Sequence, residues 1–109
     1  MDIEESADFI ATVSYLSAEQ GGLKIPATSG YRPQMKFEFI EKQTAGEQVF
    51  MDEEMVYPGT TIDAHIRLLS PEFFTRALTE GTAFDFSQGE RIIGTGIIKQ
   101  ILNDELKRF

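Results

Sequence analysis

The stretch GGLKIPATSGYRPQ, residues 21–34, concentrates residues that restrict or free the backbone. Gly21 and Gly30 can adopt positive φ without steric cost, whereas Pro33 fixes φ at about −65° and removes a hydrogen-bond donor. Arg32 precedes that proline and is therefore pushed toward extended geometry. The pattern predicts a long, shaped loop that enters a strand at the edge of a sheet.

Two further blocks of sequence accompany this loop. EMVYPG at residues 54–59 and GERIIGTGII at residues 89–98 follow it in that order, and the three blocks span most of the chain. On these residues the chain resembles the third, C-terminal domain of elongation factor Tu. The resemblance implies an all-β fold, a six-stranded closed antiparallel barrel of Greek-key type.

Alternation of apolar and polar residues indicates where the strands lie. The clearest strand is 61–70, whose alternate residues are apolar and are expected to face the core. These residues are Ile62, Ala64, Ile66 and Leu68. By the same alternation, Phe39 is expected to share a buried face with Met35 and Phe37. The six expected strands cover residues 9–16, 35–40, 48–51, 61–70, 82–86 and 92–102.

Turn-forming residues separate these strands. TAGE at residues 44–47 and SQGE at residues 87–90 are both expected to be turns. Ser70 and Pro71 are suited to the N-cap and N1 positions of a helix, and Gly81 to its C′ position. The sequence therefore predicts one short helix, of about one to two and a half turns, before the fifth strand.

The whole chain is expected to form a single domain. Its 109 residues support one modest core and leave no room for a second domain of ordinary size. Residues 1–7 are interpreted as an acidic lead-in and residues 103–109 as a polar tail with a helical turn capped by Asn103. Gly94 and Gly96, within the last strand, are expected to allow a barrel corner or a bulge.

Composition narrows the classes of function. Ten Lys and Arg residues against eighteen Asp and Glu residues give a net charge of −8, which disfavours binding to a polyanion through clustered cations. The chain has no cysteine, so it forms neither disulfides nor thiolate metal sites. It shows no signal peptide and no apolar run of about 20 residues that would cross a membrane. A cytoplasmic protein is expected.

Catalytic and metal-binding patterns are weak. The single histidine, His65, alternates onto the polar face of its strand with Asp63 and Arg67, and we expect it to be exposed and without a functional role. The acidic run 52–54 could hold a hard cation, although a solvated hairpin end is the simpler interpretation. No GxSxG elbow and no GxxxxGK phosphate loop occurs, so no cofactor is expected.

The resemblance suggests residues for a protein interface. In the family, the third domain packs against the GTPase domain, and the glycine and glutamine of that interface correspond to Gly21 and Gln34. Both residues would also suit the loop and the strand start of any barrel. The segment 71–80 is longer than its counterpart in the family and adds Phe73 and Phe74. These rings are expected either to cover the open end of the barrel or to project as an anchor for a partner.

The resemblance also suggests a surface for RNA. The family contacts the T-stem of aminoacyl-tRNA, but its Arg-His pair is Leu23-Lys24 here, and its Arg-Glu-Gly is residues 87–89, Ser-Gln-Gly. Two threonines of the family fall at Phe39 and Ile40. The cations that remain as RNA-binding candidates are Lys24, Arg32 and Arg91. The net charge of −8 weakens this prediction.

Three hypotheses about function follow. The first is a non-enzymatic binding module that contacts the translation machinery through proteins, either a translational GTPase domain or a protein that recognises elongation factor Tu. The second is aminoacyl-tRNA binding at the family's T-stem surface. The third, less favoured, is a small hydrolase that uses His65, which requires a concave pocket around that residue.

Overall fold

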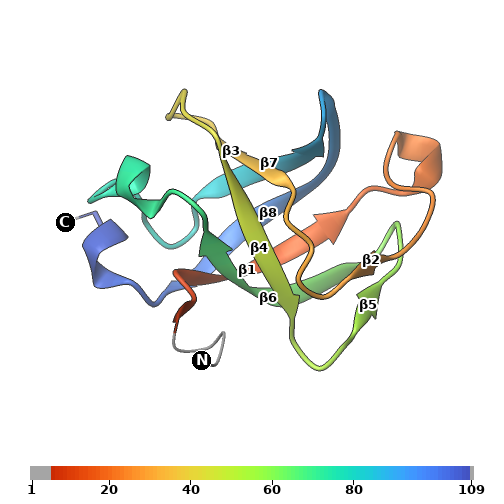
Figure 1. The fold of residues 1–109 in the computed structure, drawn as a ribbon, viewed down its shortest axis with the longest axis horizontal. Coiled ribbons are helices and arrows are strands. Elements are labelled where there is room, and N and C mark those ends of the chain that lie inside the picture. Colours follow the sequence, from red (N-terminus) through yellow and green to blue (C-terminus); the bar gives the residue numbers. More distant parts are fainter. Residues whose placement is uncertain (1–5, 109) are drawn as a thin grey trace.

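Within residues 6–108, which the computed structural model describes, six strands close into an antiparallel barrel (Figure 1). Most of the expected lead-in, residues 1–5, and the last residue of the tail, Phe109, lie outside the described residues. The barrel strands are β1 (Phe9–Tyr15), β3 (Gln34–Phe37), β4 (Thr44–Phe50), β6 (Thr61–Leu68), β7 (Ala83–Gln88) and β8 (Arg91–Ile101).

The order of the strands confirms the expected fold. Around the barrel it is β1-β6-β4-β3-β7-β8. The successive barrel strands β3, β4 and β6 are neighbours, and β1 lies beside β6 rather than beside β3, which is the arrangement of a Greek key. Two short strands, β2 (Ala27–Thr28) and β5 (Met55–Val56), form a separate two-stranded sheet outside the barrel.

Alternate residues of the strands fill the barrel interior. In β6 the side chains of Ala64, Ile66 and Leu68 are buried and Ile62 packs partly buried against the core, as their alternation predicts. In β1 every second residue, from Phe9 to Tyr15, is buried. Aromatic rings make up much of this core. Phe9, Phe37 and Phe84 pack around one another with ring centroids 5.4 to 6.4 Å apart, a range typical of favourable ring contacts.

The turn expected at residues 44–47 is wrong, because TAGE begins strand β4. Burial alternates along this segment, and Gly46 faces the core, where a Cβ atom would overlap the side chain of Met35. The glycine therefore makes room for a neighbouring side chain and does not mark a turn. The preceding strand β3 ends at Phe37, so Phe39 lies in the connection and is 57% exposed, contrary to the expected buried face.

The expected helix is a single 3-10 turn, η2 (Pro71–Phe74), with Pro71 at its start. Its C-cap is Thr75, so the C′ position predicted for Gly81 is wrong. Two other 3-10 turns are η1 (Ala18–Gln20) and η3 (Asp104–Leu106). The helical turn predicted in the tail is confirmed as η3, where Asn103 Oδ1 accepts a hydrogen bond from the Glu105 N–H at 3.1 Å.

Gly94 and Gly96 allow two rings to pack against the backbone of β8. A Cβ atom at Gly96 would overlap the ring of Phe84, and one at Gly94 would overlap the ring of Phe86. The expected irregularity is also present, because the β7–β8 register shifts between Phe86 and Ser87, directly beside Gly94. These glycines are thus required by core packing as well as by strand curvature.

The barrel has two different ends (Figure 1). At one end η2 and η3 lie beside the start of β1 and the end of β8, and we call this the helical end. There the buried Asp8 carboxylate accepts hydrogen bonds from the Leu68 N–H at 2.7 Å and from Asn103 Nδ2 at 2.9 Å. At the opposite end lie residues 16–33, the β2–β5 sheet and the β7–β8 hairpin, which together we call the loop end.

Candidate functional site

A groove of about 810 Å³ opens at the loop end of the barrel. One wall is the loop segment from Leu23 to Tyr31, and the other is formed by Gln88 and Arg91 on the β7–β8 hairpin. The sequence 21–34 therefore does form a shaped loop, and the groove lies on its concave side. The strand that it enters, β3, is paired on both sides within the closed barrel, so the expected edge position is wrong. A cavity of this volume is in the range of sites that bind small ligands or a few residues of a peptide.

The local sequence fixes the loop at both of its ends. Ser17 and Gln20 form a capping box around η1, and Gly21, at φ +96°, ends it with its N–H bonded to the Ala18 carbonyl at 3.1 Å. Gly30, at φ +95°, donates its N–H to the Gln48 carbonyl at 2.7 Å. The glycines thus supply the two positive φ angles that the loop requires, and the groove wall is anchored to the barrel.

Beneath the groove lies a polar cluster of Tyr15, Tyr31 and Gln48. Gln48 is fully buried, and its Oε1 accepts a hydrogen bond from the Tyr15 hydroxyl at 2.7 Å. Within the part of the chain that the structure describes, the Tyr31 hydroxyl and Gln48 Nε2 are buried without a hydrogen-bond partner. Burial raises the pKa of both tyrosines, and the nearby positive charge of Arg91 opposes this rise at Tyr31. All three side chains stay neutral near neutral pH.

Two cations line the groove without an acidic partner. Lys24 and Arg91 form no ion pair with any residue among 6–108. Arg32, in contrast, lies outside the groove lining, where its Nη2 approaches Glu47 Oε2 at 3.4 Å, and the same carboxylate pairs with Arg67 at 3.1 Å. Of the three RNA-binding candidates, Lys24 and Arg91 therefore line the same groove, whereas Arg32 forms an ion pair with Glu47 outside it.

The residues 2–102 match the family model of the elongation factor Tu C-terminal domain. The chain belongs to this family. Membership agrees with the closed six-stranded barrel and makes the domain a translation-factor-like module. Within residues 6–108, no helix has the length and apolar character needed to cross a membrane.

The two residues that correspond to the elongation factor Tu interface lie at the loop end of the barrel. Gly21 ends η1, two positions before the groove lining begins. Gln34 is exposed at the start of β3 and pairs in register with Ser87, the neighbour of the groove residue Gln88. Both side-chain positions are accessible, and their role as an interface remains a prediction.

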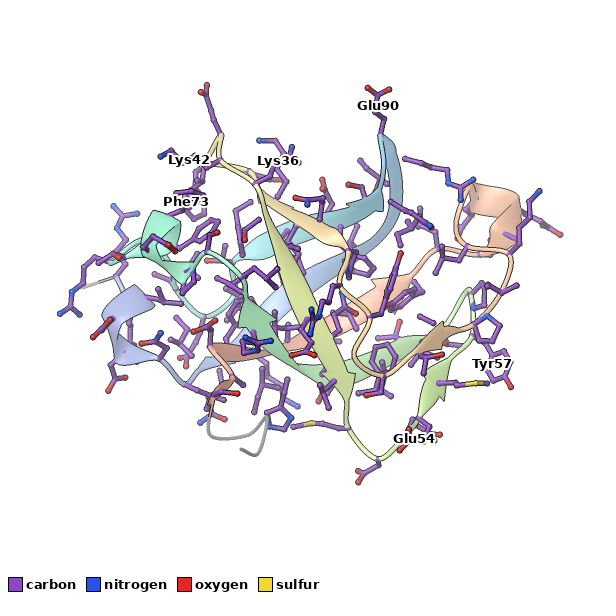
Figure 2. The ribbon with its side chains drawn as sticks, viewed as in Figure 1. Lys36, Lys42, Glu54, Tyr57, Phe73 and Glu90 are labelled. Carbon is purple, nitrogen blue, oxygen red and sulfur yellow. The ribbon has the colours of Figure 1, made fainter. Side chains whose placement is uncertain are left out.

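The two phenylalanines of the longer segment differ from each other. Phe74 is fully buried, and its ring lies 5.1 Å from that of Phe37, so it closes the helical end and cannot act as an exposed anchor. Phe73 is 42% exposed, and Lys42 Nζ lies 4.5 Å from its ring centroid (Figure 2). Only Phe73 is therefore accessible to a partner, and it lies at the end of the barrel away from the groove.

The histidine and the acidic run occupy other surfaces. His65 is half-buried in β6 between Ile10 of β1 and Val49 of β4. Asp52 and Glu53 line a second groove of about 490 Å³ together with Met55 and Tyr57. Among residues 6–108 no group of three His, Cys, Asp or Glu side chains is arranged to hold a metal ion.

Sequence reasoning missed the polar cluster beneath the groove. Its signal was present at Gln48, a polar residue that occupies an inward position in the alternating strand β4. A buried amide in such a position calls for hydrogen-bonding partners. The Tyr15 hydroxyl supplies one to Gln48 Oε1, and Gln48 Nε2 is buried without a partner among residues 6–108. The tyrosine of GYRPQ thus contributes to the barrel interior as well as to the groove.

Proposed function

We propose that this domain is a non-enzymatic binding module that acts through contacts with proteins of the translation machinery. The partner is either a translational GTPase domain or a protein that recognises elongation factor Tu. The observation that supports this most is the loop end itself, where an open groove lined by apolar and cationic side chains lies beside Gln34, whose register partner Ser87 precedes the groove residue Gln88, within a chain of net charge −8. Ile25, on the groove wall, is 71% exposed, as expected for a residue that a partner covers.

A direct titration tests this proposal. The purified domain is titrated into a translational GTPase held in its GTP form or in its GDP form, and the affinity is measured by calorimetry at about 150 mM salt. We expect binding that distinguishes the two forms. We also expect Gln34→Ala to weaken it at least about fivefold, which is about the 1 kcal/mol that truncation of a contributing interface residue costs.

The matched control is Gln100→Ala, an exposed glutamine on β8 near the helical end. This variant should bind as tightly as the wild type. The absence of any heat signal with either nucleotide form, or an equal loss in both variants, would refute the proposal.

Aminoacyl-tRNA binding is kept as a second candidate, because Lys24 and Arg91 line the same groove. Two phosphate contacts would give a logarithmic salt slope of only about −1.4 to −1.8. Affinity for aminoacyl-tRNA is therefore measured between about 50 and 200 mM salt. A slope in this range that flattens in Lys24→Ala supports tRNA binding, and no detectable binding at the lower salt concentration rejects it.

A further inference from the structure

We propose that the groove at the loop end binds an extended segment of a partner protein that carries carboxylate side chains, paired with Lys24 and Arg91. The inference rests on the proposed function, because it names the chemistry that this binding module recognises. Three features of the groove support it, namely its charge, its walls and the strand edge that it contains.

The charge of the groove is opposite to that of the whole chain. The net charge is −8, yet the two charged side chains that line the groove are both cations. Glu90 lies between the groove residues Gln88 and Arg91 on the hairpin, but its side chain points away from the barrel at the tip of that hairpin (Figure 2). Unpaired cations on an acidic protein complement a carboxylate, and they repel a basic segment.

The walls of the groove fit a polypeptide better than a nucleic acid. Leu23, Ile25 and Pro26 supply apolar surface next to the cations. A peptide that alternates acidic and apolar residues can use both kinds of surface. An RNA strand would instead bring a phosphate at every nucleotide into the field of a chain whose net charge is −8, with only two cations in the groove to neutralise them.

The groove also contains the edge of a strand. Within residues 6–108, β2 pairs with β5 on one side only, and Ala27 and Thr28 of β2 both line the groove. Because antiparallel ladder bonds alternate, the Ser29 N–H bond to the Glu54 carbonyl indicates that Ala27 bonds toward β5 and that the Thr28 backbone faces the opposite edge. The Thr28 carbonyl accepts the Tyr31 N–H at 3.1 Å, so the Thr28 N–H is the group that this edge offers to a peptide. An extended peptide can therefore lie along β2 with its side chains reaching both walls.

A capped hexapeptide that alternates glutamate with leucine is the probe, and its control replaces each glutamate by glutamine. Each is titrated into the ¹⁵N-labelled domain, and amide shifts are followed by NMR. We expect the glutamate peptide to shift the backbone amide signals of 23–31, except Pro26, which has no N–H, and that of Arg91. It should bind at least tenfold more tightly than the control. Lys24→Glu and Arg91→Glu should each weaken binding at least tenfold, whereas Lys107→Glu, at the helical end, should not.

Several outcomes would overturn the inference. Equal binding of the two peptides, shifts that map outside the groove, or a six-nucleotide RNA that binds more tightly than the glutamate peptide would each do so. Thermal unfolding of each variant identifies any that fail to fold, and Lys24→Gln and Arg91→Gln then take their place.

The failure of this inference can be distinguished from that of the proposed function. If the GTPase binds and Lys24→Glu has no effect on that affinity, the groove chemistry is wrong and the binding module stands. If the peptide binds in the groove but no translation protein does, the inference stands without its assumed partner class.

Discussion

Gly96 has no side chain, and the Phe84 ring occupies the space that a Cβ atom there would take. Gly96→Ala places a methyl group where that ring lies, and we expect the free energy of unfolding to fall by about 1 to 3 kcal/mol, the usual cost of overpacking. Urea denaturation measures the change. Thr95→Ala, an exposed neighbour on the same strand, should change stability by no more than about 0.5 kcal/mol. A neutral Gly96→Ala would mean that the ring can move aside.

Protonation of Asp63 should lower the free energy of unfolding in the acidic pH range. Its pKa is lowered by hydrogen bonds from Lys99, at 2.7 Å, and from Thr12, at 2.7 Å. The folded pKa is thus below the unfolded one of about 3.8, so the stabilisation is complete above that value and is lost as pH falls through the folded pKa.

The variant Asp63→Asn tests this dependence. It should lower the free energy of unfolding at pH 7 by up to about 1 kcal/mol, because the pair is partly exposed to solvent. Toward about pH 2.5 the difference between the variant and the wild type should shrink, because the stabilisation is lost as pH falls through the lowered pKa of Asp63. Thermal unfolding at both pH values measures the difference, and a constant gap would show that the side chain acts through packing alone.

At the scale of the element, the two adjacent rings of η2 differ in burial, because Phe74 is fully buried and Phe73 is partly exposed. Phe74→Ala should cost about 3 to 5 kcal/mol, because it empties a fully buried site at the end of the barrel. Phe73→Ala should cost less than about 1 kcal/mol, since it removes a partly exposed ring and its contact with Lys42. Chemical denaturation of both variants makes the comparison. Similar costs would show that Phe73 also contributes to closing the barrel.

Prediction from sequence succeeded where a single local rule applied. Alternation located the buried face of β6 because Ala64, Ile66 and Leu68 alternate with polar residues, and Asn103 was a sufficient signal for η3. The rule failed at Gly46, where a residue typical of turns lies in a strand so that Met35 can fill the space beside it. The reason is a tertiary contact, which no pattern within residues 44–47 contains.

The candidate site was predictable only in part for the same reason. Backbone-special residues marked the loop 21–34, and the resemblance drew attention to Lys24 and Arg91. Their placement in one groove depends on the closing of the barrel, which brings the β7–β8 hairpin next to a loop far from it in sequence. The pairing of Arg32 with Glu47 likewise follows from the position of β4 beside the loop.

At the scale of the whole molecule, the charge of −8 should make stability depend on salt. Raising salt from about 10 to 150 mM screens the repulsion among acidic side chains, so we expect Tm to rise. Salt also weakens the ion pairs, which lowers Tm, but each such pair contributes little to stability. Calorimetry near neutral pH and again near the isoelectric point of about 4.5 measures it, and the rise should shrink at the lower pH. A fall in Tm at neutral pH would mean that the ion pairs dominate.

The Asp8–Asn103 hydrogen bond has a practical consequence for handling the domain. It joins the start of β1 to the residues that follow β8 at the helical end, while the groove opens at the other end of the same two strands. A dye or a solid support attached to the residues that follow β8, such as Lys107, therefore lies on the far side of the barrel from the groove. The domain can be immobilised there with its groove presented to the solution.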